Sequence, residues 1–148
     1  MRQLLLLLVA TAGWSANLGA RAEYVGGTSI EIPNGAAGTV EAVDDHYFVF
    51  YSKNGSLRVP YEHIRFLEYG QKVDRRYILA MLISPVFVLS KSRKHFLTIG
   101  YADDGGRDQA LIFRVDKDQV RSMLVSLEVR TGRRIQYQDE EARKAGKG

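Results

Sequence analysis

An Asn-Gly pair at positions 54 and 55 separates two short segments that both have the composition of β-strands. Residues 46–51 (HYFVFY) are aromatic and β-branched, and residues 56–60 (SLRVP) form a plausible return strand. Asn-Gly favours a tight type I′ turn, because both central residues of that turn need a positive φ. Pro60 lacks the backbone donor that a sheet ladder uses, so it should end the second strand. The sequence therefore predicts a β-hairpin, whose sheet must cover its apolar face or close on itself.

Other β-patterned segments lie on either side of this hairpin. Residues 29–32 fit one short strand, and Val40 and Ala42 alternate with polar neighbours as in a half-buried strand. Residues 64–70 (IRFLEYG) predict another strand after the hairpin. Because side chains alternate along a strand, one face of it should carry three residues: Ile64, Phe66 and Glu68.

A second hairpin is predicted further along the chain. Two apolar segments, 95–101 (HFLTIGY) and 110–115 (ALIFRV), enclose a connection rich in Asp and Gly. Asp103–Asp108 carries three carboxylates, but a Ca²⁺ loop needs acids at alternate positions and a distal Glu. That spacing is absent here, so the stretch is interpreted as a turn.

The pattern changes from strand to helix after this hairpin. Four apolar residues at helical spacing predict an amphipathic helix over residues 117–131: Val120, Met123, Leu124 and Leu127. Asp116 suits the N-cap position with Gln119 as its capping-box partner, and Gly132 marks the end of the helix.

Polar residues dominate the chain beyond this helix. Arg130, Arg133 and Arg134 form a small basic patch that should favour the helix dipole and remain solvated. Residues 133–137 (RRIQY) fit a short final strand. Residues 138–148 predict a polar, disordered tail.

Together these elements predict an α+β fold that is mainly β. Six or seven antiparallel strands are followed by one C-terminal amphipathic helix, which should plug the open end of a bent sheet. Residues 38–70 also resemble GRAM and bacterial PH-like domains, through a Gly-led strand, an aromatic strand, the Asn-Gly hairpin and the "VPYEHI" sequence. The resemblance covers Gly38–Arg130 and implies a PH-like small barrel. Residues 93–135 resemble a set of uncharacterised exported bacterial proteins, which implies no particular activity.

One departure from that superfamily concerns its best-known ligands. PH domains that bind phosphoinositides carry Lys and Arg on their first hairpin and its loop. The corresponding residues here, 32–43 (IPNGAAGTVEAV), include neither Lys nor Arg. The resemblance therefore does not support a phosphoinositide ligand.

The N-terminal residues have the features of a secretory signal peptide. A basic start at Arg2 is followed by the apolar run Leu4–Ala10 and by the small-x-small triplet Ala20-Arg21-Ala22. The sequence predicts a signal peptide over 1–22, a PH-like domain over 23–137, and export to the periplasm or the medium. A retained anchor is the alternative, but the apolar run is well short of the roughly 20 residues that a spanning helix needs. The chain has no cysteine, so it can form neither a disulfide nor a lipid anchor at the cleavage site.

Charge and composition bear on the remaining functional classes. The chain has 21 basic and 17 acidic residues, and this small excess does not favour nucleic acid as a partner. His46, His63 and His95 fall in no metal-binding or catalytic motif, and no cysteine is present to complete a zinc site. The sequence therefore predicts a non-enzymatic protein without a metal or cofactor.

Residues 75–95 (RRYILAMLISPVFVLSKSRKH) are the most unusual segment. Tyr77–Leu89 is uncharged and lies between basic clusters, but as a helix it would span only about 20 Å of a hydrocarbon layer of about 30 Å. Pro85 would also break such a helix. Two hypotheses remain: the segment is buried in the core, or it contacts a membrane interface or an apolar partner. The contact residues would then be Arg75, Arg76, Leu82, Phe87, Leu89, Lys91, Arg93 and Lys94.

The sequence as a whole predicts an exported, non-enzymatic binding or scaffolding domain. Its partner would be an anionic membrane surface or an apolar protein surface. The alternative is a protein–protein interaction module, or a homo-oligomer that pairs through a strand edge. A third class would be an enzyme with a site built from separated residues such as Glu62 and His63.

Overall fold

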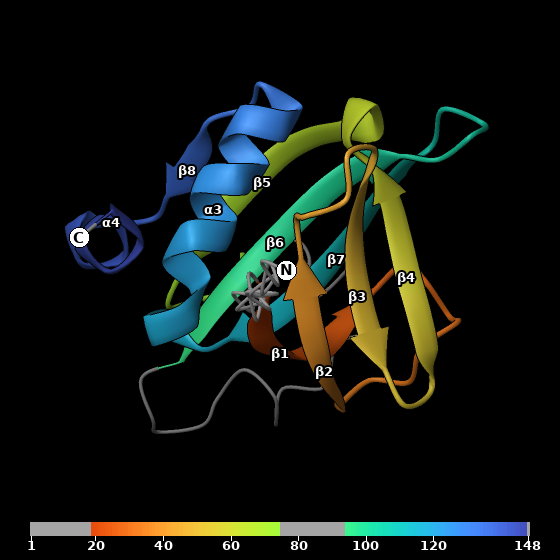
Figure 1. Ribbon diagram of the computed structural model, residues 1–148, viewed down its shortest axis with the longest axis horizontal. Helices are drawn as coiled ribbons and strands as arrows, with labels where there is room; N and C mark the ends of the chain where they lie inside the picture. The colour runs from red at the N-terminus through yellow and green to blue at the C-terminus, as the bar shows by residue number, and fades with distance from the viewer. Residues whose placement is uncertain (1–18, 75–93, 148) are drawn as a thin grey trace, which may run out of the picture.

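The computed structural model describes residues 19–74 and 94–147, which form one bent sheet and two α-helices (Figure 1). The strands are β1 (Ala20–Gly27), β2 (Ala36–Glu41), β3 (Tyr47–Ser52), β4 (Gly55–Pro60), β5 (Ile64–Gly70), β6 (His95–Ala102), β7 (Asp108–Val115) and β8 (Ile135–Tyr137). The helices are the 3₁₀ turn η1 (Tyr61–His63), α3 (Lys117–Thr131) and α4 (Glu140–Lys147). The predicted class, α+β and mainly β, is confirmed.

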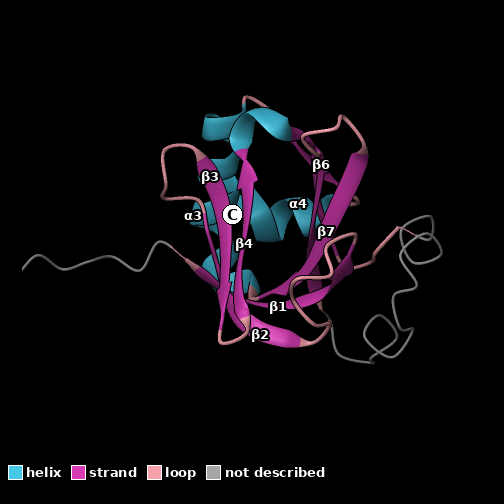
Figure 2. Ribbon diagram, turned by 90° about the vertical axis from the view of Figure 1, so that its right-hand side faces the viewer, coloured by secondary structure: helices cyan, strands magenta, loops and turns pink. Residues whose placement is uncertain are grey.

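The sheet has the strand order β4-β3-β2-β1-β7-β6-β5-β8. Neighbouring strands are antiparallel, except that β8 runs parallel to β5. Figure 2 shows β3 and β4 on one side and β6 and β7 on the other, with β1 and β2 joining the two sides at the base. Strands β4 and β8 end the order, so the described sheet does not close into a barrel.

The first predicted hairpin is formed by β3 and β4, but its turn lies one residue earlier than predicted. Ser52 pairs with Gly55, so the two turn residues are Lys53 and Asn54. The Ser52 hydroxyl supports this turn, because it accepts a hydrogen bond from the Asn54 N–H and donates one to the Gly55 carbonyl. Gly55 then starts β4 with a φ of 136°, a value that L side chains rarely adopt.

The centre of the core is an aromatic cluster that joins distant strands. The Phe113 ring on β7 lies 5.0 Å from Phe50, 5.7 Å from Phe48 and 5.6 Å from Tyr24, measured between ring centroids. All four side chains are fully buried. Because Phe48 and Phe50 belong to β3 and Tyr24 to β1, this cluster holds the two sides of the bent sheet together.

The predicted face alternation in β5 is wrong at its first residue. The β5–β6 register shifts between Ile64 and Phe66, as at a β-bulge. The extra residue puts Ile64 in the same core as Leu67 and Tyr69. Phe66 and Glu68 therefore lie on the opposite face from Ile64, and Phe66 is only partly buried.

Helix α3 begins and ends where the sequence predicts. The Asp116 carboxylate accepts a hydrogen bond from the Asp118 N–H, and Gly132 ends the helix in the left-handed conformation with a φ of 66°. The predicted capping-box role of Gln119 is wrong, because its side-chain oxygen accepts a hydrogen bond from the Arg21 N–H at 3.0 Å. The predicted apolar residues are all buried: Val120, Met123, Leu124 and Leu127.

Three chain segments differ from the sequence-based expectations. Strand β1 extends across the predicted cleavage position, and Ala20 and Ala22 are buried within it. Residues 29–32 form no strand. Where a disordered tail is predicted over 138–148, the structure has α4, whose Ala142 is fully buried in the core. Ala142 and the partly buried Ala145 form a small apolar face through which this short, otherwise polar helix packs against the core.

Candidate functional site

Only one of the predicted contact residues lies in the described part of the chain, and that residue is Lys94. The other seven fall outside it: Arg75, Arg76, Leu82, Phe87, Leu89, Lys91 and Arg93. The segment Tyr77–Leu89 also lies outside the described residues. Whether it is core or contact surface stays a prediction, and Lys94 is the predicted contact residue whose surroundings the structure describes.

Lys94 lines a groove of about 620 Å³ at the end of the sheet where β6 begins and β7 ends. The strand register explains this arrangement, because Val115 pairs with Ala22 of β1 on one side and with His95 of β6 on the other. Helix α3 starts directly after β7, so its first turn forms another wall. Side chains distant in sequence therefore meet at one end of the fold.

The groove contains more basic than acidic side chains. Four basic residues line it: Arg21, Lys94, Arg114 and Lys117. Three acidic residues also line it: Glu23, Asp116 and Asp118. The first turn of α3 adds the positive end of the helix dipole to this field.

Two of the acidic residues are already paired with arginines. Arg21 Nη2 lies 2.9 Å from Asp116 Oδ2, and Arg114 forms an ion pair with Glu23 across the β1–β7 ladder. No such contact joins Lys94 or Lys117 to another described residue. These two lysines are therefore the side chains best able to meet an external anion.

His95 forms the inner wall of the groove and is held by a buried tyrosine. Its Nδ1 lies 2.9 Å from the Tyr69 hydroxyl, and the two rings stack with centroids 5.5 Å apart. Burial raises the pKa of Tyr69 above its ordinary value, so its hydroxyl stays protonated at neutral pH. His95 is only 7% exposed, so this pair is part of the buried interior next to the groove.

The other two histidines lie away from this groove. His46 is in the β2–β3 connection, and His63 Nε2 lies 3.8 Å from Glu62 Oε1. The Glu62 side chain is largely exposed to solvent. Across residues 19–74 and 94–147, no group of three or more His, Asp or Glu side chains is placed to hold a metal ion.

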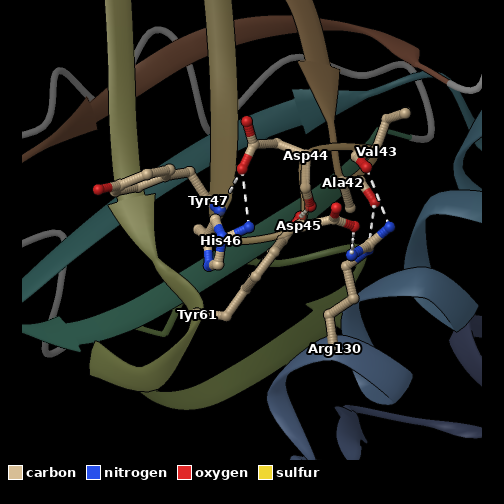
Figure 3. Close-up of polar contacts among 8 residues, drawn as sticks. All are labelled: Ala42, Val43, Asp44, Asp45, His46, Tyr47, Tyr61 and Arg130. Carbon is tan, nitrogen blue, oxygen red and sulfur yellow. Dashed lines mark hydrogen bonds and ion pairs between the residues drawn. The ribbon is translucent and has the colours of Figure 1, made fainter.

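A second pocket, of about 520 Å³, lies between η1, the β2–β3 connection and the end of α3. Figure 3 shows Arg130 reaching from α3 to this connection. Its Nε donates to the Ala42 carbonyl at 3.1 Å, its Nη2 to the Val43 carbonyl at 2.9 Å, and its Nη1 lies 3.0 Å from Asp45 Oδ1. The prediction that Arg130 remains solvated is therefore wrong, because its guanidinium fastens the helix to the sheet.

The same connection is shaped by Tyr61 and Asp44 (Figure 3). Burial raises the pKa of Tyr61 to about 12, and its protonated hydroxyl donates to the Asp44 carbonyl at 2.9 Å. The Asp44 carboxylate accepts hydrogen bonds from the N–H groups of His46 and Tyr47 at 2.7 and 2.9 Å. These contacts fix the conformation of the β2–β3 connection beside the pocket. The side chains of Arg130 and Asp44 are engaged in these intramolecular hydrogen bonds.

The hydrogen bonds to Asp44 predict an acid-dependent loss of stability. They hold its pKa below the ordinary value, so the folded state binds this proton less readily than the unfolded state. The stabilisation is complete above the unfolded pKa of about 4 and is lost as the pH falls through the folded pKa. Asp44→Asn keeps an acceptor but cannot titrate. The urea midpoint of this variant should therefore fall less than that of the wild type between pH 7 and pH 3, and equal falls would contradict the prediction.

No protein-family model matches the chain. No curated protein matches it at a significant level either. Among the described residues, no helix is both long and apolar enough to cross a bilayer.

The sequence pointed to Lys94 but missed the residues that surround it. The sequence predicts that Arg21 belongs to the signal peptide and that Lys117 is the first residue of a helix. Arg114 carried a usable signal, because it is the one charged residue in the apolar segment 110–115. Its partner Glu23 is 91 positions away, so the pair could not be recognised without the strand register.

Proposed function

We propose that this protein is an exported, non-enzymatic binding or scaffolding domain of the PH-like kind. The strand connectivity supports this fold assignment. Strands β1–β4 follow one another in an antiparallel meander, β5–β7 form a second one, and α3 follows the last hairpin.

We place the contact surface at the groove around Lys94 and Lys117, facing an anionic membrane surface. One observation carries this choice: Lys94, at the described end of the basic-flanked segment, lines the same groove as Lys117 of α3, and neither lysine forms an ion pair with another described residue. Basic side chains near an anionic leaflet contribute about 1 kcal/mol each. The uncharged residues Tyr77–Leu89, which precede Lys94 in the sequence, would supply the apolar part of the contact.

Vesicle flotation tests this function. The wild-type protein should float with anionic phosphatidylglycerol vesicles, remain at the bottom with zwitterionic phosphatidylcholine vesicles, and be released by salt. The double charge reversal Lys94→Glu/Lys117→Glu should reduce the bound fraction at least tenfold, because two attractive charges become repulsive. The matched control is Lys53→Glu/Lys144→Glu, which makes the same change in net charge at two exposed lysines outside the groove.

The outcomes separate the possible contact surfaces. If the control loses as much binding as the groove variant, net charge and not the groove drives the association. If the wild type stays at the bottom with both kinds of vesicle, the membrane proposal is wrong and the protein–protein alternative takes its place. Replacing Phe87 and Leu89 by Ser tests the apolar part separately, because loss of binding with an unchanged unfolding midpoint would indicate contact and not core burial.

A further inference from the structure

Strands β6 and β7 are buried on both faces of the sheet. Leu97 and Ile99 of β6 belong to the main core. Their neighbours Phe96 and Thr98 point to the opposite face, because side chains alternate along a strand, yet both are only 2% exposed. We name the side chains of this second face the outer cluster, which comprises the partly buried Phe66 and the buried Phe96, Thr98, Ala110 and Ile112.

The outer cluster is continuous across three strands. Thr98 of β6 pairs with Ile112 of β7, and Gly100 pairs with Ala110. The Phe66 ring of β5 lies over Gly100, since a Cβ on that glycine would come 1.9 Å from Phe66 Cε1. Ile112 is 0% exposed. Neighbours within a sheet cover only the sides of such a side chain, so a further layer of protein must lie over it.

The two described α-helices do not supply this layer. The buried residues of α3 and Ala142 of α4 belong to the same core as Leu97 and Ile99. Both helices therefore pack against the face of the sheet that lies opposite the outer cluster. Another part of the chain has to cover the outer cluster.

The connection from β5 to β6 begins and ends beside the outer cluster. Gly70, the last residue of β5, pairs with Phe96, and Val73 is already buried three residues later. The nineteen residues 75–93, which lie outside the described part of the chain, have ample length to reach the cluster. Half of them span about 14 Å as a helix or about 31 Å when extended, whereas Thr98 is only about 7 Å along the strand from Phe96.

We propose that the uncharged segment Tyr77–Leu89 packs against the outer cluster and forms a second apolar layer of the fold. Its side chains match those of the cluster in chemistry, and burying both against each other removes apolar surface from water. Only the side of the segment that faces away from the sheet is then left for a membrane leaflet. This packing does not depend on membrane binding, so flotation and the experiment below can fail separately.

Single thiols test the proposal, because the chain has no cysteine of its own. Thr98→Cys in the full chain should react slowly with a maleimide. Replacing residues 77–89 by a Gly-Ser linker of equal length should raise the rate at least about tenfold, because the reaction follows local exposure. Met123→Cys, buried on the core side of the sheet, should stay protected in the same linker variant. A linker in place of the other apolar run, Leu4–Ala10, should leave Thr98→Cys protected.

The other outcomes are equally defined. The proposal is overturned if Thr98→Cys stays protected in the 77–89 linker variant, or becomes reactive only when residues 4–10 are replaced. If Met123→Cys also becomes reactive, the linker variant has unfolded, and disulfide formation in the full chain decides. A second cysteine, placed in turn at each position from 77 to 89, should form a disulfide with Thr98→Cys at one or more positions. No disulfide at any position, or equally efficient pairing with Ser56→Cys on the exposed part of β4, would contradict the proposed packing.

Discussion

Replacing Phe113 by alanine should lower the free energy of unfolding by about 3–5 kcal/mol, the usual cost of removing a large aromatic side chain from a packed core. Its ring contacts aromatic rings on both sides of the bent sheet, with centroid distances of 5.0 Å to Phe50 and 5.6 Å to Tyr24. The alanine side chain would leave a cavity that these rigid neighbours cannot fill. Urea denaturation followed by circular dichroism measures the change.

An aromatic side chain outside this cluster provides the matched control. Tyr51 lies on the same strand as Phe50 but is 43% exposed and points away from the cluster. Tyr51→Ala should therefore cost less than about 1 kcal/mol, as is usual for surface substitutions. If both variants lose similar stability, the aromatic cluster is not the centre of this core.

The elements predicted correctly are those whose signals are local. The β3–β4 hairpin, although not the exact position of its turn, and the helix that begins after Asp116 depend on turn residues, the N-cap and side-chain period within a few residues. Side-chain alternation gave a wrong prediction in β5, where a β-bulge adds one residue and reverses which face the first side chain is on. Nothing in residues 64–70 reveals the bulge that places Ile64 in the core with Leu67, because that bulge is defined by the pairing with β6.

Strand β1 and helix α4 were missed for a related reason. The triplet Ala20-Arg21-Ala22 has the form of a cleavage site, and its role as a strand depends on β2 and β7 lying on either side. Residues 138–148 are polar in composition, but Ala142 finds a buried position beside the core. The composition of a segment gives only its average polarity. Here the packing depends on single small residues, Ala20 and Ala22 in β1 and Ala142 in α4, that are buried in the core.

The lining of the candidate groove also depends on strand pairing that the local sequence does not reveal. A basic cluster could be read from the sequence around Lys94, since its members are close in the chain. Arg114 and Glu23 join it through the antiparallel register of β1, β7 and β6, and Lys117 joins it because α3 starts directly after β7. Which basic residues are neutralised and which remain available for a ligand is therefore a property of the fold.

Replacing Arg130 by methionine should lower the free energy of unfolding by about 2–3 kcal/mol, because the variant loses charge-assisted hydrogen bonds and leaves two carbonyl groups without their donor. The affected acceptors are the carbonyls of Ala42 and Val43, and Asp45 also loses its ion pair. Methionine keeps much of the side-chain length, so the change tests the guanidinium more than the packing of the stem. Urea denaturation at neutral pH measures the effect.

Two further variants separate the geometry of Arg130 from its charge. Arg133→Met removes the same charge from an exposed position just after α3 and should change the unfolding free energy by less than about 0.5 kcal/mol. Arg130→Lys keeps the charge but cannot present three donors in one plane, so it should recover less than half of the loss. If Arg130→Lys is as stable as the wild type, charge alone fastens α3 to the sheet. If Arg130→Met costs no more than Arg133→Met, the contacts at Ala42 and Val43 contribute little, and the second pocket is not held by this arginine.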